Sequence, residues 1–427
     1  MKKLILTALS ACFLATVLTG CKEKTAATAA APELCNTPIA DYLYGVEYDD
    51  YDFEAAAQAM AKRFNSAAPA CSEVRKGNFV GRNLDWYINT DAAAIIKINK
   101  SDARYASIGM IGANSVFSNE FAKSGEYSPL YNALPMATTD GINENGVFIG
   151  VNVMPTGETS FDESTWEHGK WGHGAAYTNP DAKETHCVTY LARVILDRAK
   201  SVADAKQIIE SINWYEPKGF PVPGSSQAFH WLISDATTSV VLEFLDNKPY
   251  YCETTDINAP SYATIMTNFT NKLMEEKGMI QNSGNGYERY DLLKEAYPTT
   301  EESFTGMQDL LKEVWYSKAY TKEIGSKDFW FTEFVEDVSA KDLYKNPDVW
   351  KNETYTNAMK VNQTNFNNKA NWHVADSPLW YTTHTTVYDL AARKFHVLIH
   401  EGRDEQKDFM EVSLNDTHFE KPLEHKK

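Results

Sequence analysis

Cys71 is the residue whose neighbours best suit it to act as a nucleophile. It follows a loop of small residues at 65–70 and opens a run that is typical of a β-hairpin, with the turn at 76–78. Because cross-strand neighbours in a hairpin touch, this pattern brings Arg82 and Asp85 close to the thiol. A free thiol has a pKa of about 8.5, and a nearby guanidinium favours the thiolate. The spacing therefore predicts a reactive cysteine.

The elements that would hold these residues alternate between strands and helices along the chain. Their order is not a strict β-α-β repeat, so we expect an α+β or layered fold in a single catalytic domain. The expected elements are a helix at 53–64, short strands within 71–152, helical structure over 187–213, strands within 229–246, helical structure over 287–315 and a closing hairpin at 378–400.

The composition is that of a globular protein with an acidic surface. The chain has 427 residues, of which 43% are hydrophobic and 23% are charged, enough to bury one large core or two ordinary ones. Its formal net charge is -17, and no basic stripe offsets that charge. A phosphate backbone would be repelled, so we expect no nucleic-acid partner.

Residues 1–20 are typical of an export signal. Two lysines precede an apolar stretch at 4–18 that is too short for a stable membrane span. The stretch ends in Leu18-Thr19-Gly20-Cys21, which resembles the bacterial lipobox, where the cysteine is acylated and becomes the first residue of the mature protein. We expect an exported lipoprotein, held to a membrane through the lipid on Cys21, in the periplasm or at the cell surface. Lys22 favours the outer membrane.

In an exported chain the cysteines beyond the leader can also form disulfides. Cys71 with Cys35 would bridge the small-residue loop, and Cys187 with Cys252 is a second pairing that the spacing leaves open. In that interpretation the arginine and aspartate after Cys71 would be an ordinary surface ion pair.

Five motifs in a fixed order single out a family. They are Cys71 with the run 81–86, the run 140–146 with 150–152, the run 230–235 with Glu243, the run 266–268, and the run 286–290, followed by a closing strand at 380–389. In this order they resemble the choloylglycine hydrolase and linear-amide hydrolase group, over essentially residues 71–400. Bile salt hydrolases and penicillin V acylases belong to that group, and acid ceramidase is more distant. One departure is the separation of 11 residues between Cys71 and Arg82, which is shorter than in bile salt hydrolases and bears on the substrate subclass.

The resemblance implies an N-terminal-nucleophile hydrolase with a four-layer αββα sandwich. Cys71 would become the first residue once the segment before it is removed. Its α-amino group, with an ordinary pKa of about 7.7–8.0, would take the thiol proton and later protonate the leaving amine. Arg82 would stabilise the thiolate, and Asp85 would orient the amine.

Three further residues receive catalytic roles from the same resemblance. Asn152 and Asn268 would donate hydrogen bonds to the oxyanion, each worth about 2.7–4 kcal/mol in the transition state. Arg289 would add positive charge nearby. The alternatives are that the asparagines are turn residues and that the arginine is a solvated helix residue.

Aromatic residues supply candidates for the substrate pocket. Trp86 ends the first motif, and Trp166 and Trp171 belong to a glycine-rich stretch that would either line an apolar acyl pocket or pack on the body. The histidines lack a metal-ligand spacing such as His-Glu-x-x-His, so we interpret them as core or surface histidines. We expect no metal and no organic cofactor.

These patterns predict three segments and one reaction. The segments are a signal peptide at 1–20, a lipid-anchored tether and propeptide at 21–70 and the hydrolase domain at 71–427. The expected reaction is hydrolysis of a linear, non-peptide amide with an apolar acyl group, such as a conjugated bile acid or another N-acyl amide. An acyltransferase of the same fold and a non-catalytic lipoprotein binding module are the alternatives. A homo-oligomer and the fate of 21–70 after cleavage are left open.

Overall fold

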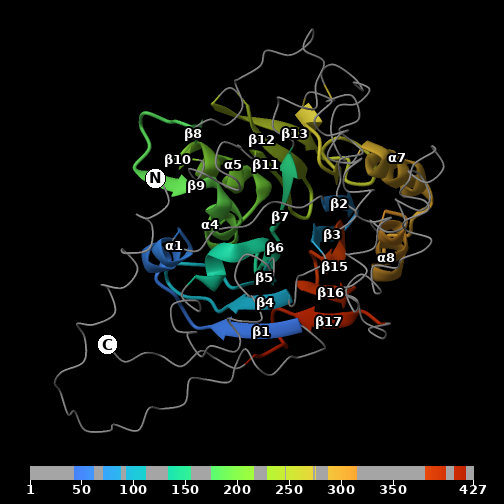
Figure 1. Ribbon diagram of the computed structural model, residues 1–427, viewed down its shortest axis with the longest axis horizontal. Coiled ribbons are helices and arrows are strands. Elements are labelled where there is room, and N and C mark those ends of the chain that lie inside the picture. The colour runs from blue at the N-terminus through green and yellow to red at the C-terminus, as the bar shows by residue number, and fades with distance from the viewer. Residues whose placement is uncertain are drawn as a thin grey trace, which may run out of the picture.

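Two large β-sheets form the centre of the molecule (Figure 1). The computed structural model describes residues 43–61, 71–87, 93–111, 133–154, 175–215, 228–245, 247–272, 275, 287–314, 380–400 and 408–419. The leader with Cys21, the position of Cys35, and Trp166 and Trp171 lie outside these ranges.

The larger sheet has eight strands, which are antiparallel except at one edge, where β1 runs parallel to β4. All seven residues of β12 are buried, which suits a strand covered on both faces and its mainly apolar sequence. In spatial order the strands are β1 (Leu43–Tyr48), β4 (Ala93–Ile98), β5 (Ser107–Ile111), β6 (Thr138–Asn143), β7 (Phe148–Met154), β11 (Ala228–Ser234), β12 (Ser239–Leu245) and β13 (Lys248–Thr254).

The second sheet has six antiparallel strands and contains the expected hairpin. A two-residue turn joins its first two long strands, and Gly77 adopts a φ of 54° there, a conformation that favours glycine. The resulting register places Cys71 opposite Leu84. In spatial order the strands are β14 (Ile265–Met266), β2 (Cys71–Lys76), β3 (Phe79–Tyr87), β15 (Trp380–Asp389), β16 (Lys394–Ile399) and β17 (Met410–Ser413).

Helices cover the outer faces of the two sheets. The side chains of Ser201 and Ser303 cap the first turns of α5 (Val202–Glu210) and α8 (Phe304–Lys312). The helices are α1 (Phe53–Ala61), α4 (Leu191–Arg198), α5 (Val202–Glu210), α7 (Tyr287–Ala296) and α8 (Phe304–Lys312), with 3-10 turns η3 (Leu134–Ala137), η4 (Val188–Tyr190) and η5 (Tyr297–Thr299). A small third sheet has the order β8 (Ala175–Tyr177), β10 (Ile212–Tyr215), β9 (Glu184–Cys187).

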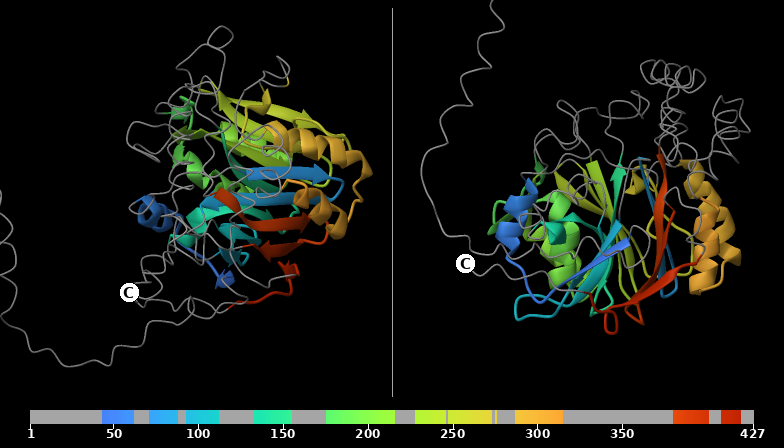
Figure 2. Two further views of the ribbon diagram at one scale, coloured as in Figure 1. Left: turned by 45° about the vertical axis from the view of Figure 1, so that its right-hand side comes forward. Right: turned by 60° about the horizontal axis from the view of Figure 1, so that its bottom comes forward.

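Three apolar clusters define four layers. One packs α4 and α5 on the eight-stranded sheet, a second fills the space between the two sheets, and a third packs α7 and α8 on the six-stranded sheet. The right-hand view of Figure 2 shows both sheets nearly edge-on, with the green helices outside one and the orange helices outside the other. The expected α+β fold and αββα sandwich are confirmed.

The structure refines two expectations for the elements. Helical structure over 187–213 is two helices flanked by β9 and β10, because Ser201 starts a new helix and ends the earlier periodicity. The segment before Cys71 carries a strand, β1, that the sequence pattern did not signal.

None of the described cysteines takes part in a disulfide. Cys187 and Cys252 are both buried and are not bonded to each other, so the pairing that the spacing left open does not form. Cys71 is likewise a thiol. Among the described helices, none has both the length and the apolar character needed to cross a membrane.

Candidate active site

Cys71 is the first residue of β2 and is fully buried. Side chains alternate along a strand, so Cys71 and Glu73 share one face of β2, the face turned toward the other large sheet. The two sheets approach closely at this point. A β carbon on Gly150 of β7 would lie 2.5 Å from a carboxyl oxygen of Glu73, so any larger residue there would have to displace that carboxyl.

The backbone nitrogen of Cys71 is held by an asparagine from a distant part of the chain. It donates to Asn268 Oδ1 at 2.7 Å, and Arg289 Nη2 donates to the same oxygen at 2.6 Å. Arg289 comes from α7, and its other terminal nitrogen pairs with Asp85 Oδ2 at 2.8 Å. Thr382 Oγ1 donates to the second oxygen of Asp85 at 2.6 Å.

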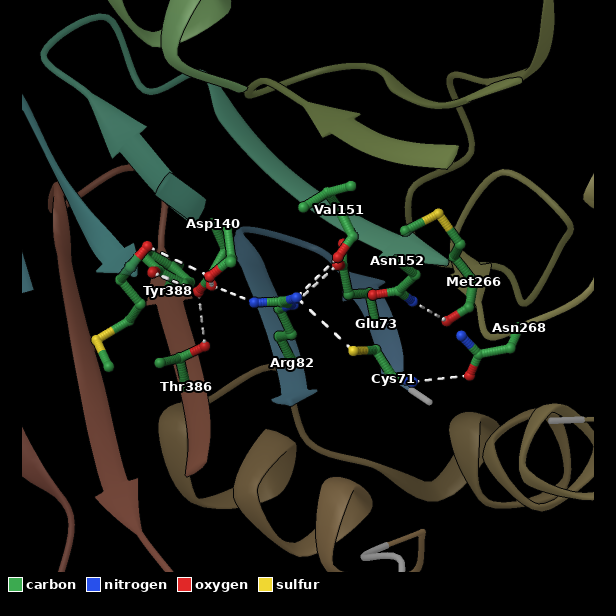
Figure 3. A network of polar contacts seen from close by, with 12 residues as sticks. Cys71, Glu73, Arg82, Asp140, Val151, Asn152, Met266, Asn268, Thr386 and Tyr388 are labelled. Carbon is green, nitrogen blue, oxygen red and sulfur yellow. Dashed lines mark hydrogen bonds and ion pairs between the residues drawn. The ribbon is translucent and has the colours of Figure 1, made fainter. Parts of the chain in front are cut away.

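The oxygen that faces the Cys71 nitrogen belongs to Asn268, whereas the Asp85 carboxyl pairs with Arg289. Because Asn268 presents Oδ1 to the Cys71 nitrogen, its Nδ2 is turned the other way, and Figure 3 shows that nitrogen on the side of Asn152 and Met266.

Arg82 reaches the sulfur and joins the two sheets. Its Nη2 lies 3.8 Å from Cys71 Sγ and donates to the Val151 carbonyl at 2.7 Å. Its Nε lies 3.1 Å from Glu73 Oε1, and its Nη1 pairs with Asp140. Figure 3 shows this guanidinium between the cysteine on one side and Asp140 on the other.

Asp140 is a fully buried carboxylate that collects donors from both sheets. Besides Arg82, it accepts from the Tyr388 hydroxyl at 2.7 Å and from Thr386 Oγ1 at 3.1 Å, both on β15. Thr139 Oγ1 adds a hydrogen bond at 2.8 Å. This network fixes the direction of the Arg82 side chain.

Asn152 is buried and lies on β7, in the large sheet that faces the sheet of Cys71. In one amide orientation Nδ2 reaches only the Met266 carbonyl, at 3.4 Å. Rotated by half a turn, Nδ2 lies 3.0 Å from both the Val151 carbonyl and Glu73 Oε1, which satisfies the amide better. The Glu73 carboxyl therefore contacts this amide as well as the guanidinium.

Burial dominates the electrostatics of the site. It raises the pKa of the Cys71 thiol to about 12, while the charge of Arg82 opposes that shift. It also raises the pKa of Glu73 to about 8 and that of Asp85 to about 6, although in each case an arginine favours the ionised form. The thiol of the uncut chain is therefore protonated near neutral pH.

The sequence motifs did not assign roles to Glu73 or Asp140. A signal for Glu73 exists, since it stands two residues after Cys71 in the same strand and must share its face. Asp140 begins the second motif, but its pairing with Arg82 across the two sheets has no sequence signal.

His230 is a core histidine, as expected. It is fully buried opposite Asn152 in the register of β7 and β11, and its Nδ1 lies 3.2 Å from Glu243 Oε1. Glu243 in turn accepts from the backbone nitrogens of Asn271 at 2.6 Å and Lys272 at 3.0 Å, just after Asn268. This pair thus braces the turn that carries Asn268.

The structure does not place the predicted pocket residues. Trp166 and Trp171 lie outside the described ranges, and only the backbone of Trp86 is described, in β3. Within the described part of the chain, no group of three or more histidine, cysteine or acidic side chains could hold a metal ion.

A buried cysteine at the head of an inner strand of an αββα sandwich is the arrangement of the N-terminal-nucleophile hydrolases. A comparison with protein families is consistent with it: residues 71–276 match the linear amide C-N hydrolases, choloylglycine hydrolase family. The match begins at Cys71 itself and supports a hydrolase acting on linear amides. The resemblance seen in the motifs is confirmed.

Among solved structures, the chain is similar to two enzymes at low identity. A mutant of conjugated bile acid hydrolase from Clostridium perfringens is 14% identical, with 82% of this chain and 93% of that chain covered and a TM-score of 0.39. Penicillin V acylase from Agrobacterium tumefaciens is 15% identical, with 77% and 82% covered and a TM-score of 0.35. No curated protein matches the chain. Likenesses with TM-scores this low do not bear on the function of this chain.

Proposed function

We propose that the protein is a cysteine-dependent hydrolase of a linear N-acyl amide and that Cys71 forms the acyl-enzyme. The family match supports hydrolysis of a carbon–nitrogen bond. The observation that supports the cysteine assignment is that both the backbone nitrogen and the sulfur of Cys71 have polar partners. Asn268 Oδ1 lies 2.7 Å from the Cys71 nitrogen, and Arg82 Nη2 lies 3.8 Å from its sulfur.

Cleavage before Cys71 is the first step of this scheme. Hydrolysis of the Ala70–Cys71 peptide bond consumes one water and leaves a carboxylate on Ala70 and an amine on Cys71. Because the buried thiol has its pKa raised to about 12, it needs a base at neutral pH. A free α-amine, with an ordinary pKa of about 7.7–8.0, is a base within the same residue. Cleavage by the chain itself or by another protease fits equally.

Substrate turnover then takes two halves. The Cys71 amine takes the thiol proton and the sulfur attacks the acyl carbon. The side-chain amides of Asn152 and Asn268 donate to the oxyanion, and Asn152 exchanges its contact with Glu73 for the substrate oxygen. The carbon–nitrogen bond breaks as the ammonium returns the proton to the leaving nitrogen. A water deprotonated by the same amine attacks the thioester, the acid leaves, and the sulfur regains its proton.

The substrate we propose has an apolar acyl group, such as a conjugated bile acid or another N-acyl amide. We also propose that the protein acts outside the cytoplasm as a lipoprotein anchored through Cys21, which the lipobox-like residues 18–21 support.

N-terminal sequencing and amine release test the proposal together. Active protein should start at Cys71 and release free amine from glycine or taurine conjugates or from N-acyl amines. Cys71→Ala should lower that rate at least about a thousandfold, because the nucleophile is lost. Cys187→Ala, the same change at another buried cysteine, is the matched control and should keep the activity.

Three outcomes would contradict the scheme. Active protein that starts uniformly at Cys21 would remove the free amine from the mechanism. Transfer of the acyl group to an added amine in preference to water would identify an acyltransferase. Tight binding of the amides without turnover would identify a binding module.

A further inference from the structure

The segment before Cys71 supplies an edge strand of the larger sheet. β1 pairs with β4 over six residues, from Leu43 opposite Ala93 to Tyr48 opposite Ile98. Leu43 and Val46 are fully buried. Figure 1 shows this strand, in blue, continuing the sheet beside β4. Removing it would expose the backbone edge of β4 and uncover two apolar clusters.

A buried ion pair fastens β1 to the rest of the body. Glu47 and Lys97 are 2% and 3% exposed, and Lys97 Nζ lies 3.6 Å from Glu47 Oε1. The other oxygen of Glu47 accepts from the Phe419 backbone nitrogen at 2.9 Å, and Asn99 Nδ2 donates to Oε1 at 2.9 Å. Loss of the segment would separate this buried pair and break the hydrogen bonds of Glu47, which is unfavourable.

The helix after β1 packs into the same body. Ala56 and Met60 of α1 are buried in one apolar cluster with residues of η3 and with Tyr190. The Tyr190 hydroxyl donates to the Ala57 carbonyl at 3.1 Å. These contacts involve the part of the chain that follows Cys71, so they do not depend on an intact peptide bond at 70–71.

The loop between β1 and α1 adds polar contacts of the same kind. The Tyr51 hydroxyl donates to Asp197 at 2.5 Å, and the Arg104 guanidinium lies over the Tyr51 ring at 3.8 Å from its centre. Arg104 Nη1 also donates to the Tyr51 carbonyl at 2.8 Å. The segment 43–61 therefore contacts the body through a sheet edge, a buried ion pair, an apolar helix face and a tyrosine.

We propose that residues 43–61 remain bound after cleavage as a separate, non-covalent chain, so that the working enzyme consists of two chains. This inference rests on the cleavage before Cys71 given under the proposed function. The interaction surface is the edge of β4 together with the apolar residues that pack on α1, and its partner is this segment of the same protein. If the lipid is attached at Cys21, the retained segment also keeps the catalytic chain on the membrane.

Co-purification of the two chains tests the inference directly. Full-length protein with a tag at the C-terminus is purified under native conditions and examined by denaturing gel, N-terminal sequencing and native mass spectrometry. We expect a tagged chain that starts at Cys71 and an untagged fragment containing 43–61, in a one-to-one ratio. Mild urea should release the fragment and the amidase activity together.

Substitutions within the segment sharpen the test. Val46→Asp and Met60→Asp place a charge in the buried surface, and each should lower the amount of fragment per catalytic chain at least tenfold. Gln58→Asp is the matched control on the exposed side of α1 and should leave the ratio unchanged. If an aspartate variant fails to fold at all, urea release from the unaltered protein still measures the contact.

The outcomes separate this inference from the proposed function. A fully active chain that starts at Cys71 and lacks the fragment would overturn retention while leaving the amidase assignment intact. An active chain that is never cut would overturn the cleavage, and retention with it.

Discussion

The Arg82 guanidinium is shared between the Cys71 thiol and two buried acidic side chains. It lies 3.8 Å from the Cys71 sulfur, but it also pairs with Glu73 and Asp140. Because Asp140 already pairs with this cation, Arg82 stabilises a thiolate at Cys71 less than an unpaired arginine would. Burial therefore outweighs it, and the pKa of the thiol is raised. The thiolate expected from the hairpin alone is therefore not favoured near neutral pH in the intact chain.

Glu73 gives a test at this level, because burial raises its pKa to about 8 from an ordinary value of 4.5. The folded state thus holds the Glu73 proton more tightly than the unfolded state does. The stability that this proton supplies is complete below pH 4.5 and is lost as the pH rises through about 8. Glu73→Gln is neutral throughout, so its urea midpoint should fall less over that window than the midpoint of the unaltered protein.

The same change of charge at an exposed position is the control for Glu73. Glu301→Gln should leave the dependence of the urea midpoint on pH as it is in the unaltered protein. Identical slopes for Glu73→Gln and the unaltered protein would show that the Glu73 proton does not contribute.

Four separate structural elements contribute residues to the site. β2 presents Cys71, β7 presents Asn152, the turn after β14 presents Asn268, and α7 presents Arg289. The helix is held by its apolar face: Leu293 is fully buried in the cluster that covers the six-stranded sheet. Arg289 and Leu293 are four residues apart and share one face of α7, so packing of the leucine places the arginine.

Leu293→Ala tests how far the helix positions the site. Loss of the buried side chain should cost about 2–5 kcal/mol in the free energy of unfolding, and kcat/KM should fall because Arg289 is held less firmly. Urea unfolding and amide-hydrolysis kinetics measure the two effects. Lys294→Ala, at the exposed neighbouring position, should change neither. A destabilised Leu293→Ala enzyme with undiminished kcat/KM would mean that other contacts place Arg289.

In the whole molecule, the site exists only when the two large sheets are docked. Arg82 from the six-stranded sheet bonds to Asp140 and to the Val151 carbonyl on the other sheet. The Glu73 carboxyl packs directly against Gly150 of that sheet, where a β carbon would displace it. The described part of the fold holds itself together through such contacts and its apolar clusters, without a disulfide bridge.

The effect of a thiol reductant on thermal stability tests whether the molecule lacks a disulfide. Neither Cys187 nor Cys252 takes part in a disulfide, and each lies in a separate apolar cluster. A disulfide contributes about 2–4 kcal/mol, which corresponds to a shift of several degrees in the midpoint of thermal unfolding. We therefore expect a thiol reductant to move that midpoint by less than about 1 °C. A clear decrease would show that a cross-link forms in the purified protein.

The sequence by itself determined the hairpin from Cys71, the nearness of Arg82 to the thiol and the family, because a tight turn sets the register of close neighbours and motif order is read along the chain. Only the tertiary structure decided which group faces the backbone nitrogen of Cys71. Asn268 lies 197 residues from Cys71, and Arg289 lies 204 residues from Asp85. The tertiary structure also decided that β1 joins the larger sheet and that Asp140 pairs with Arg82. Such contacts arise when sheets and helices pack together. The local periodicity of apolar residues does not indicate which buried polar groups will then come into contact.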